Sequence, residues 1–353
     1  MNQINALTQA IDNHFSWHKS RKTLLKEMIA SAIKTGHVYH KKFAECVEKN
    51  VNVESTVRRI QRFFSEQQID YIEVGRIILD LLNLKDNLIL AMDRTNWEFG
   101  TKDVNYLVIS VIYDSTSIPL VWIDLNKKGN SNTEERKDLI DLLLNIVDSS
   151  KIKALIGDRE FEGEEWFDYL KNKKIKFFIR LKSSHLLKHK NGGRLKAKEI
   201  FKELKIKETI TKKDKIMGIQ CQVTALRLER DLLIVASNDL DIEPEKILRI
   251  YKDRWKIETL FKNMKTKGFN IEETHMKDKD KLEKLFMILT FGCAICILAG
   301  KIKNYLIKII IKKNGRFLYS LFTYGIDFLK NTLFTPISSF KNKYLYVAIQ
   351  IYT

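Results

Sequence analysis

The first 85 residues carry apolar side chains at the spacing of an α-helix. These side chains recur three and four positions apart with basic residues between them, as at Leu24, Leu25, Met28, Ile29 and Ile33. The alternation of a β-strand is absent from this stretch. The pattern predicts a helical domain over residues 1–85, in which a turn at 50–53 precedes a short helix at 54–67.

From about residue 86 the apolar period changes from helical to β. Five runs have the composition of strands, at residues 88–96, 106–114, 118–125, 152–156 and 176–181. Helical patterns separate the last three: one over 132–147, capped by Asn132 or Thr133, and one over 164–171. Three consecutive strands followed by helix, strand, helix and strand is the order of an RNase H-like α/β fold with a mixed sheet.

Residues 183–240 interrupt that order with a Lys-rich stretch and two β-like runs, 216–228 and 232–237, which predict a β-rich insertion. Pro244 then opens a long helix, predicted over 245–267 and ended by Gly268. The resulting organisation is a helical domain (1–85), a catalytic core in two parts (86–182 and 241–300) around the insertion (183–240), and a basic, helical C-terminal segment (301–353).

The longest apolar run, residues 285–299, is shorter than the roughly 18–20 residues that a membrane-spanning helix needs, so we interpret it as a buried helix. Its Cys293 and Cys296 have no neighbouring Cys or His cluster, which favours packing over metal chemistry. Four scattered cysteines and the lack of a basic, apolar leader predict a reduced, cytosolic protein that is neither exported nor membrane-bound.

Charge indicates the partner. With 62 Lys and Arg against 44 Asp and Glu, the formal net charge is +18, which favours a polyanion. Arg58, Arg59 and Arg62 cluster in the short helix after the turn, either as a recognition helix or as a solvated basic face over a core formed by Phe63 and Phe64. After Gly300, one acid accompanies nine basic residues, at positions 301, 303, 308, 312, 313, 316, 330, 341 and 343, which favours phosphate contact.

Two aspartates stand where an RNase H-like sheet would bring them together. Asp93 lies inside the first predicted strand and Asp158 follows Gly157 at the end of the fourth, and these strands are neighbours in that fold. A buried, unpaired carboxylate is costly unless a cation or hydrogen bonds satisfy it. Separately, Asp93 is also compatible with a frayed strand end and Asp158 with an ordinary turn. Together they predict a shared metal site.

The long predicted helix supplies a third carboxylate. At about 100° per residue, Tyr251, Arg254, Glu258 and Lys265 fall within about a 60° arc of one helical face. An adjoining arc is apolar and anchors the helix to the sheet, through Ile250, Ile257, Phe261 and Met264. The simpler interpretation of Arg254 and Glu258 is a solvated pair four residues apart.

The aspartates Asp93 and Asp158, with Tyr251-x2-Arg254-x3-Glu258-x6-Lys265, resemble the DDE triad and YREK signature of bacterial transposases of the insertion-sequence-four family. The surrounding strings are similar to the same family: LAMDRTNWEFG (90–100), GNSNTEER (129–136), GDREFEGEEWF (157–167) and RWKIETLFKNMKTKGFNIEETH (254–275). The resemblance covers residues 58–329 and implies a cut-and-paste DNA transposase. From the arginine cluster on the short helix we predict that the helical domain over residues 1–85 is its DNA-binding domain.

The resemblance implies that Asp93, Asp158 and Glu258 hold two Mg²⁺ or Mn²⁺ ions. It also implies that Arg254 and Lys265 clamp phosphates near the cleaved end, to which Tyr251 adds a hydroxyl. Trp255 is a candidate for stacking on a displaced base, with an ordinary core Trp as the alternative.

The implied partners are double-stranded DNA, as transposon ends and target, and a second protomer in the DNA complex, in the bacterial cytoplasm at the nucleoid. C-terminal helices join protomers in related transposases, so dimerisation is the competing use of the basic tail. Some relatives cut the second strand through a hairpin assisted by a Trp in the insertion, and residues 183–240 contain no Trp. The alternatives are a catalytically idle DNA-binding descendant and another RNase H-like nuclease. Residues 344–353 receive no assignment.

Overall fold

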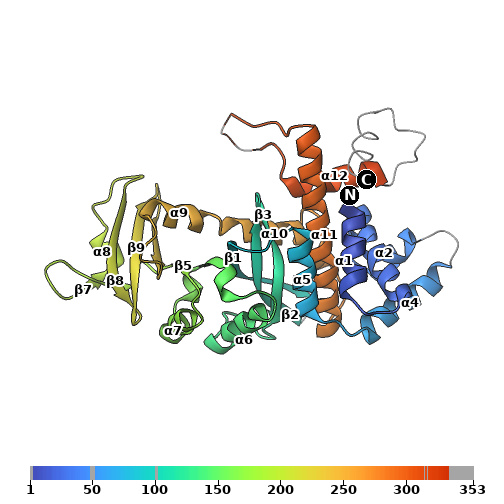
Figure 1. Ribbon diagram of the computed structural model, residues 1–353, viewed down its shortest axis with the longest axis horizontal. Coiled ribbons are helices and arrows are strands. Elements are labelled where there is room, and N and C mark those ends of the chain that lie inside the picture. The colour runs from blue at the N-terminus through green and yellow to red at the C-terminus, as the bar shows by residue number, and fades with distance from the viewer. Residues whose placement is uncertain (1–2, 48–51, 100–101, 314, 316, 334–353) are drawn as a thin grey trace. The chain divides into compact units, whose positions relative to one another are not determined.

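The computed structural model describes residues 3–47, 52–99, 102–313, 315 and 317–333. It divides into two compact units (Figure 1). The sheet unit comprises Lys85–Asn96 and Asn105–Glu258, and the helical unit comprises Met1–Leu84, Trp97–Val104 and Thr259–Thr353. The predicted C-terminal basic positions 316, 341 and 343, the segment 344–353 and the start of the turn at 50–53 lie outside the described residues.

The sheet unit is built on one eight-stranded mixed sheet with the order β3-β2-β1-β4-β5-β10-β9-β8. The first five strands are those predicted from the sequence: β1 (Leu88–Phe99), β2 (Lys102–Tyr113), β3 (Thr116–Asp124), β4 (Ile152–Gly157) and β5 (Phe177–Arg180). β2 and β3 pair antiparallel, whereas β4 runs parallel to both β1 and β5. This mixed α/β architecture confirms the predicted fold class and is consistent with an RNase H-like domain.

Helices cover both faces of the central strands because successive side chains point to opposite sides. On one face Ala154, Ile156 and Phe178 pack in a buried cluster with Ile250 and Tyr251 of α9 (Pro244–Lys252). On the other face the ring of Phe177 lies 4.4 Å from that of Phe167 in α7 (Glu164–Asn172). The central strands are therefore buried on both faces, as parallel strands usually are.

The hydrogen bonds at the start of α6 (Thr133–Leu144), the helix between β3 and β4, show which residue caps it. The Asn132 side chain accepts from the Glu135 backbone N–H, and the Glu135 side chain accepts from the Asn132 N–H. This reciprocal pair is a capping box, so Asn132 rather than Thr133 is the cap.

The insertion is β-rich, but it continues the main sheet: β10 (Leu232–Ser237) pairs with β5, and β9 (Ile219–Arg227) and β8 (Thr209–Ile216) follow. The single predicted run 216–228 was wrong at its start, because Ile216 ends β8. Met217 and Gly218 form a two-residue turn, both with positive φ. The remainder of the insertion contributes a small hairpin, β6 (Leu186–Lys188) and β7 (Arg194–Lys196), and one helical turn, α8 (Ala197–Ile200).

The predicted single helix over 245–267 was wrong. It is two helices, α9 and α10 (Trp255–Lys265), separated at Asp253 and Arg254. At the break the backbone bonds shorten to three residues: Asp253 N–H donates to Ile250 O, and Arg254 N–H donates to Tyr251 O, both at 3.0 Å. Tyr251 and Glu258 therefore do not share one uninterrupted helical face. α10 begins in the sheet unit and ends in the helical unit.

The helical unit confirms the helical pattern near the N-terminus. Its helices are α1 (Gln3–His14), α2 (Lys19–Thr35), α3 (His40–Cys46), α4 (Val53–Glu66), α5 (Tyr71–Leu81), α11 (Lys279–Leu306) and α12 (Leu321–Leu333). Within this unit α11 packs against α1, α2, α4, α5 and α12 (Figure 1). A Cβ atom on Gly325 of α12 would lie 1.7 Å from the carbonyl oxygen of Cys296, so glycine permits this close helix contact.

The apolar run at 285–299 lies inside α11 and is buried, as predicted. By length and composition α11 could cross a membrane, but 89% of its most apolar 18-residue window is buried within the protein. Cys293 and Cys296 are free and fully buried. These observations describe the central helix of a packed domain.

Candidate active site

Asp93 and Asp158 lie at neighbouring positions of adjacent parallel strands. In the register of β1 and β4, Met92 pairs with Gly157. Asp93 directly follows Met92 in the sequence, and Asp158 directly follows Gly157. Each carboxylate accepts from the N–H of the following residue: Asp93 from Arg94 at 2.8 Å and Asp158 from Arg159 at 2.5 Å. The sheet thus fixes both aspartates side by side at the position that the strand order predicted.

The third carboxylate, Glu258, lies within electrostatic reach of this pair. Asp93 is 20% exposed. Burial, helped by the negative charges of Asp158 and Glu258, raises the pKa of Asp93 to about 6, even though the Arg94 N–H and the Arg254 guanidinium lower it. The three acidic groups therefore form one electrostatically coupled cluster.

Arg254 stands among these carboxylates. Its Nη1 is 3.4 Å from Asp93 Oδ2, and its Nη2 is 2.5 Å from Glu258 Oε1. Burial lowers the pKa of Arg254, but the acidic groups around it, Tyr251, Glu258 and Asp158, outweigh burial and leave that pKa raised. The pair between Arg254 and Glu258 is therefore partly buried rather than fully solvated, because the side chains are 10% and 28% exposed.

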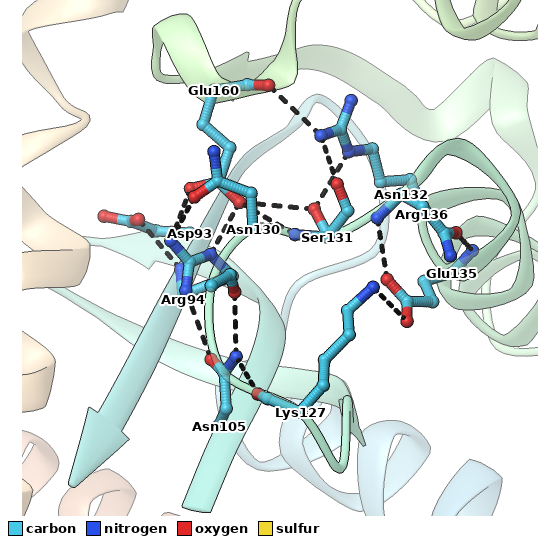
Figure 2. A network of polar contacts seen from close by, with 11 residues as sticks. Asp93, Arg94, Asn105, Lys127, Asn130, Ser131, Asn132, Glu135, Arg136 and Glu160 are labelled. Atoms are coloured by element: carbon cyan, nitrogen blue, oxygen red, sulfur yellow. Dashed lines mark hydrogen bonds and ion pairs between the residues drawn. The ribbon is translucent and has the colours of Figure 1, made fainter.

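A second polar network holds the segments that carry the two aspartates (Figure 2). The guanidinium of Arg94 makes a bidentate pair with Glu160, with Nε to Oε1 at 2.6 Å and Nη2 to Oε2 at 2.9 Å. Arg94 also donates to Asn105 on β2 and to Asn130. Because Arg94 follows Asp93 and Glu160 comes two residues after Asp158, this pair links β1 directly to the turn after β4.

Glu160 is tied in turn to the segment before α6 (Figure 2). Its Oε1 accepts from both the backbone N–H and the hydroxyl of Ser131, each at 3.3 Å. The buried Arg136 donates to the carbonyls of Ser131 and Glu160, at 2.6 and 3.1 Å. Sequence reasoning assigned no role to these residues. The available signal was position: Arg94 and Glu160 lie within two residues of Asp93 and Asp158, and Ser131 and Arg136 lie in another of the strings that carry the family resemblance.

A comparison with protein families identifies the family to which the chain belongs. The family model described as the transposase DDE domain matches residues 84–296, more than half of the chain. The chain belongs to the transposase DDE domain family. No curated protein matches the chain. Membership implies a DNA-binding enzyme that acts in transposition.

The donor set of this DDE transposase fits a hard divalent cation, of the kind that the family generally uses. Three carboxylates from β1, the end of β4 and α10 offer oxygen ligands, and their mutual charge is what a cation would offset. Among the described residues no group of three or more His, Cys, Asp or Glu side chains forms a ready coordination sphere. Instead, the guanidinium of Arg254 contacts two of the three carboxylates.

Trp255 and Tyr251 lie on opposite sides of Arg254 in the sequence and differ in exposure. Trp255 is 61% exposed, which excludes the alternative of an ordinary core Trp, and its ring centre is 5.3 Å from the Arg254 guanidinium carbon. Tyr251 is 5% exposed, and its hydroxyl has no hydrogen-bond partner among the described residues. The structure therefore presents Trp255 to solvent and packs Tyr251 in the core.

A cavity of about 620 Å³ lies beside these residues within the sheet unit. Tyr251, Arg254 and Trp255 line one part of it, and apolar side chains of β9, β10 and α9 line another, among them Leu226, Leu233 and Leu248. Charged side chains complete the lining, among them Arg180, Asp231 and Arg249, so the cavity combines an apolar wall with a charged rim.

The remaining predicted DNA contacts belong to the helical unit. Lys265, at the end of α10, lies 3.1 Å from Glu272 and 5.9 Å from the centre of the Trp97 ring. On α4, Arg58 and Arg62 are exposed and Arg59 is partly buried, above the fully buried Phe63 and Phe64. Both interpretations of the arginine cluster share this geometry, so its contact with DNA stays a prediction.

Proposed function

We propose that this chain is a transposase of the insertion-sequence-four group that cleaves DNA at the ends of its element and joins the resulting 3′-hydroxyl ends to target DNA. The observation that supports this most directly is the register of β1 and β4, which places Asp93 beside Asp158, with Glu258 near enough to raise the pKa of Asp93. A DNA-binding descendant without activity would have no use for three carboxylates clustered at this cost in desolvation and repulsion.

In this proposal Asp93, Asp158 and Glu258 are the ligands of two Mg²⁺ or Mn²⁺ ions. When bound, the ions activate the attacking oxygen and stabilise the leaving oxygen of an in-line displacement at phosphorus. The sheet fixes the positions of two of the three proposed metal ligands, Asp93 and Asp158. The pair between Arg94 and Glu160 holds their positions, so little reorganisation of the aspartates is needed during the reaction.

Arg254 is the proposed phosphate clamp of the sheet unit. Its planar guanidinium now contacts two carboxylates, and the same donor geometry fits the oxygens of a phosphate. Trp255 offers an exposed ring next to that clamp, on which a displaced base can stack for about 1–3 kcal/mol. Lys265, in the helical unit, is a further proposed phosphate contact through its ammonium group.

The proposed partners are double-stranded DNA, as element ends and target, and a second protomer. Self-association is supported by exposed apolar side chains near the end of α11 and after it, including Tyr305, Ile307, Ile310 and Ile311, which are 53–69% exposed. Such a concentration of exposed apolar residues is typical of an interaction surface. We place the protein in the bacterial cytoplasm, at the nucleoid.

A nicking assay tests the proposed function. The DNA on both sides of the gene is first searched for the inverted repeats that the proposal expects, and the purified chain is then incubated with a labelled duplex carrying that repeat, with and without Mg²⁺. We expect nicks at the repeat boundary that leave 3′-hydroxyl ends, and none in the presence of EDTA. Nicking without preference for the boundary would favour another RNase H-like nuclease, and binding without any nicking would favour an idle descendant.

A further inference from the structure

A hollow of about 310 Å³ lies within the helical unit, on the surface of α2 and α4. Three of the five side chains that line it are arginines: Arg21 from α2, and Arg59 and Arg62 from α4, together with Ser20 and Leu24. Arg59 and Arg62 are three residues apart and share one face of α4. Arginines distant in sequence thus converge on one concave surface.

The charges around this hollow are largely of one sign. Arg21 pairs with Glu66 at 3.0 Å, but Glu66 is 57% exposed, so this pair is weak and open to solvent. Among the residues that the structure describes, neither Arg59 nor Arg62 has an acid within ion-pair distance. Cations gathered at a concave surface focus a positive potential, which favours an anion.

The supports of the hollow are well packed. On α2 Leu24 and Leu25 are buried, and on α4 Ile60 and Phe63, which directly follow Arg59 and Arg62 in the sequence, are fully buried. The backbones that carry the guanidinium groups are therefore held by the core of the helical unit. Arg58 differs from its neighbours: it is exposed on the same helix but does not line the hollow.

We propose that Arg21, Arg59 and Arg62 form a binding site for one phosphate of the DNA backbone. A guanidinium presents a rigid fork of donors that matches phosphate oxygens, and convergent guanidinium groups can surround one phosphate from two sides. This site rests on the proposed function, because it takes the bound polyanion to be DNA. It assigns the contact to two helices and excludes Arg58, whereas the sequence pattern grouped Arg58 with Arg59 and Arg62.

The test compares charge losses inside and outside the hollow in the full-length chain. Arg21→Gln, Arg59→Gln and Arg62→Gln are measured for binding to an element-end duplex over a salt series, with Arg58→Gln as the matched control. Each phosphate neutralised contributes a slope of about −0.9 in log affinity against log salt. In the double variant of Arg59 and Arg62 we expect the salt slope to become shallower by roughly 0.9, the contribution of one phosphate, and the affinity for the duplex to fall about tenfold. The affinity of Arg58→Gln should stay within about twofold of the wild type.

Three outcomes are decisive. Equal losses from Arg58→Gln and from the hollow variants would show a diffuse basic face and overturn the site. Arg59→Lys tests the geometry of the contact. If the planar guanidinium is needed, this variant should regain part of the salt slope that Arg59→Gln loses, but little of the affinity. Inorganic phosphate should compete with the duplex for the wild type and lose that effect in the double variant; competition unchanged by the substitutions would also overturn the site.

These results separate the site from the proposed function. If the wild type binds and nicks the end duplex but the hollow variants behave like the control, only the phosphate site fails. If the wild type neither prefers the end duplex nor nicks it, the proposed function fails. Circular dichroism at each salt concentration confirms that a variant is folded, and the three positions are tested separately so that a single unfolded variant does not decide the outcome.

Discussion

Asp93→Asn, Asp158→Asn and Glu258→Gln should each lower the rate of DNA nicking by about a thousandfold or more, equivalent to about 4 kcal/mol of transition-state stabilisation. Each substitution keeps the shape of the side chain and removes one negative ligand from the coupled cluster. The measurement is the single-turnover rate on a labelled end duplex with Mg²⁺.

Binding should survive these changes. Three carboxylates that face a phosphate backbone repel it when no cation offsets them, so the neutral variants should bind the end duplex at least as tightly as the wild type without metal. Asp168→Asn, which alters an exposed acid on α7 of the same unit, is the matched control and should nick normally. Near-normal nicking by any one of the three triad variants would remove that residue from the site.

Arg94→Lys and Glu160→Gln should lower the nicking rate by about a hundredfold, because a misplacement of reacting groups by about 1 Å can cost that much. The Arg94 and Glu160 side chains are only 18% and 15% exposed, and their bidentate pair joins the strands that carry Asp93 and Asp158. Lysine keeps the charge at position 94 but cannot reproduce the fork. The rate is measured as a function of Mg²⁺ concentration.

The metal dependence distinguishes positioning from simple loss of structure. If the pair sets the spacing of the aspartates, both variants should need a higher Mg²⁺ concentration for half-maximal rate while their DNA affinity stays that of the wild type. Lys173→Ala breaks an exposed ion pair with Asp141 elsewhere in the sheet unit and serves as the control. A lower rate at an unchanged Mg²⁺ requirement would contradict the positioning role.

The sequence predicted the position of the two aspartates because strand order determines it. The runs at 88–96 and 152–156 begin with apolar residues, and the first strand pairs with the second on one edge only, so its other edge is free for a parallel neighbour. Once those strands pair, Asp93 and Asp158 follow from a register that the apolar pattern also sets. The positions of the two aspartates could therefore be predicted from the sequence.

Other features had no signal in the apolar pattern. The break between α9 and α10 contains neither Pro nor Gly, so helical periodicity ran through it and placed Tyr251 on the same face as Arg254. β8 carries three lysines and little apolar alternation, because its outer face is exposed at the edge of the sheet. The pair between Arg94 and Glu160 depends on tertiary contacts across 66 residues, which periodicity does not report.

The most direct test of metal coordination by the three carboxylates is the metal dependence of the Asp158→Cys variant. A thiolate is a softer ligand than a carboxylate, so Mg²⁺ binds it poorly and a transition metal such as Mn²⁺ binds it better. Single-turnover nicking of the end duplex is measured with each metal, for the variant and the wild type. We expect the wild type to nick with both metals, whereas Asp158→Cys should be inactive with Mg²⁺ and regain measurable nicking with Mn²⁺. Equal activity of the variant with the two metals, whether high or low, would contradict direct coordination by residue 158.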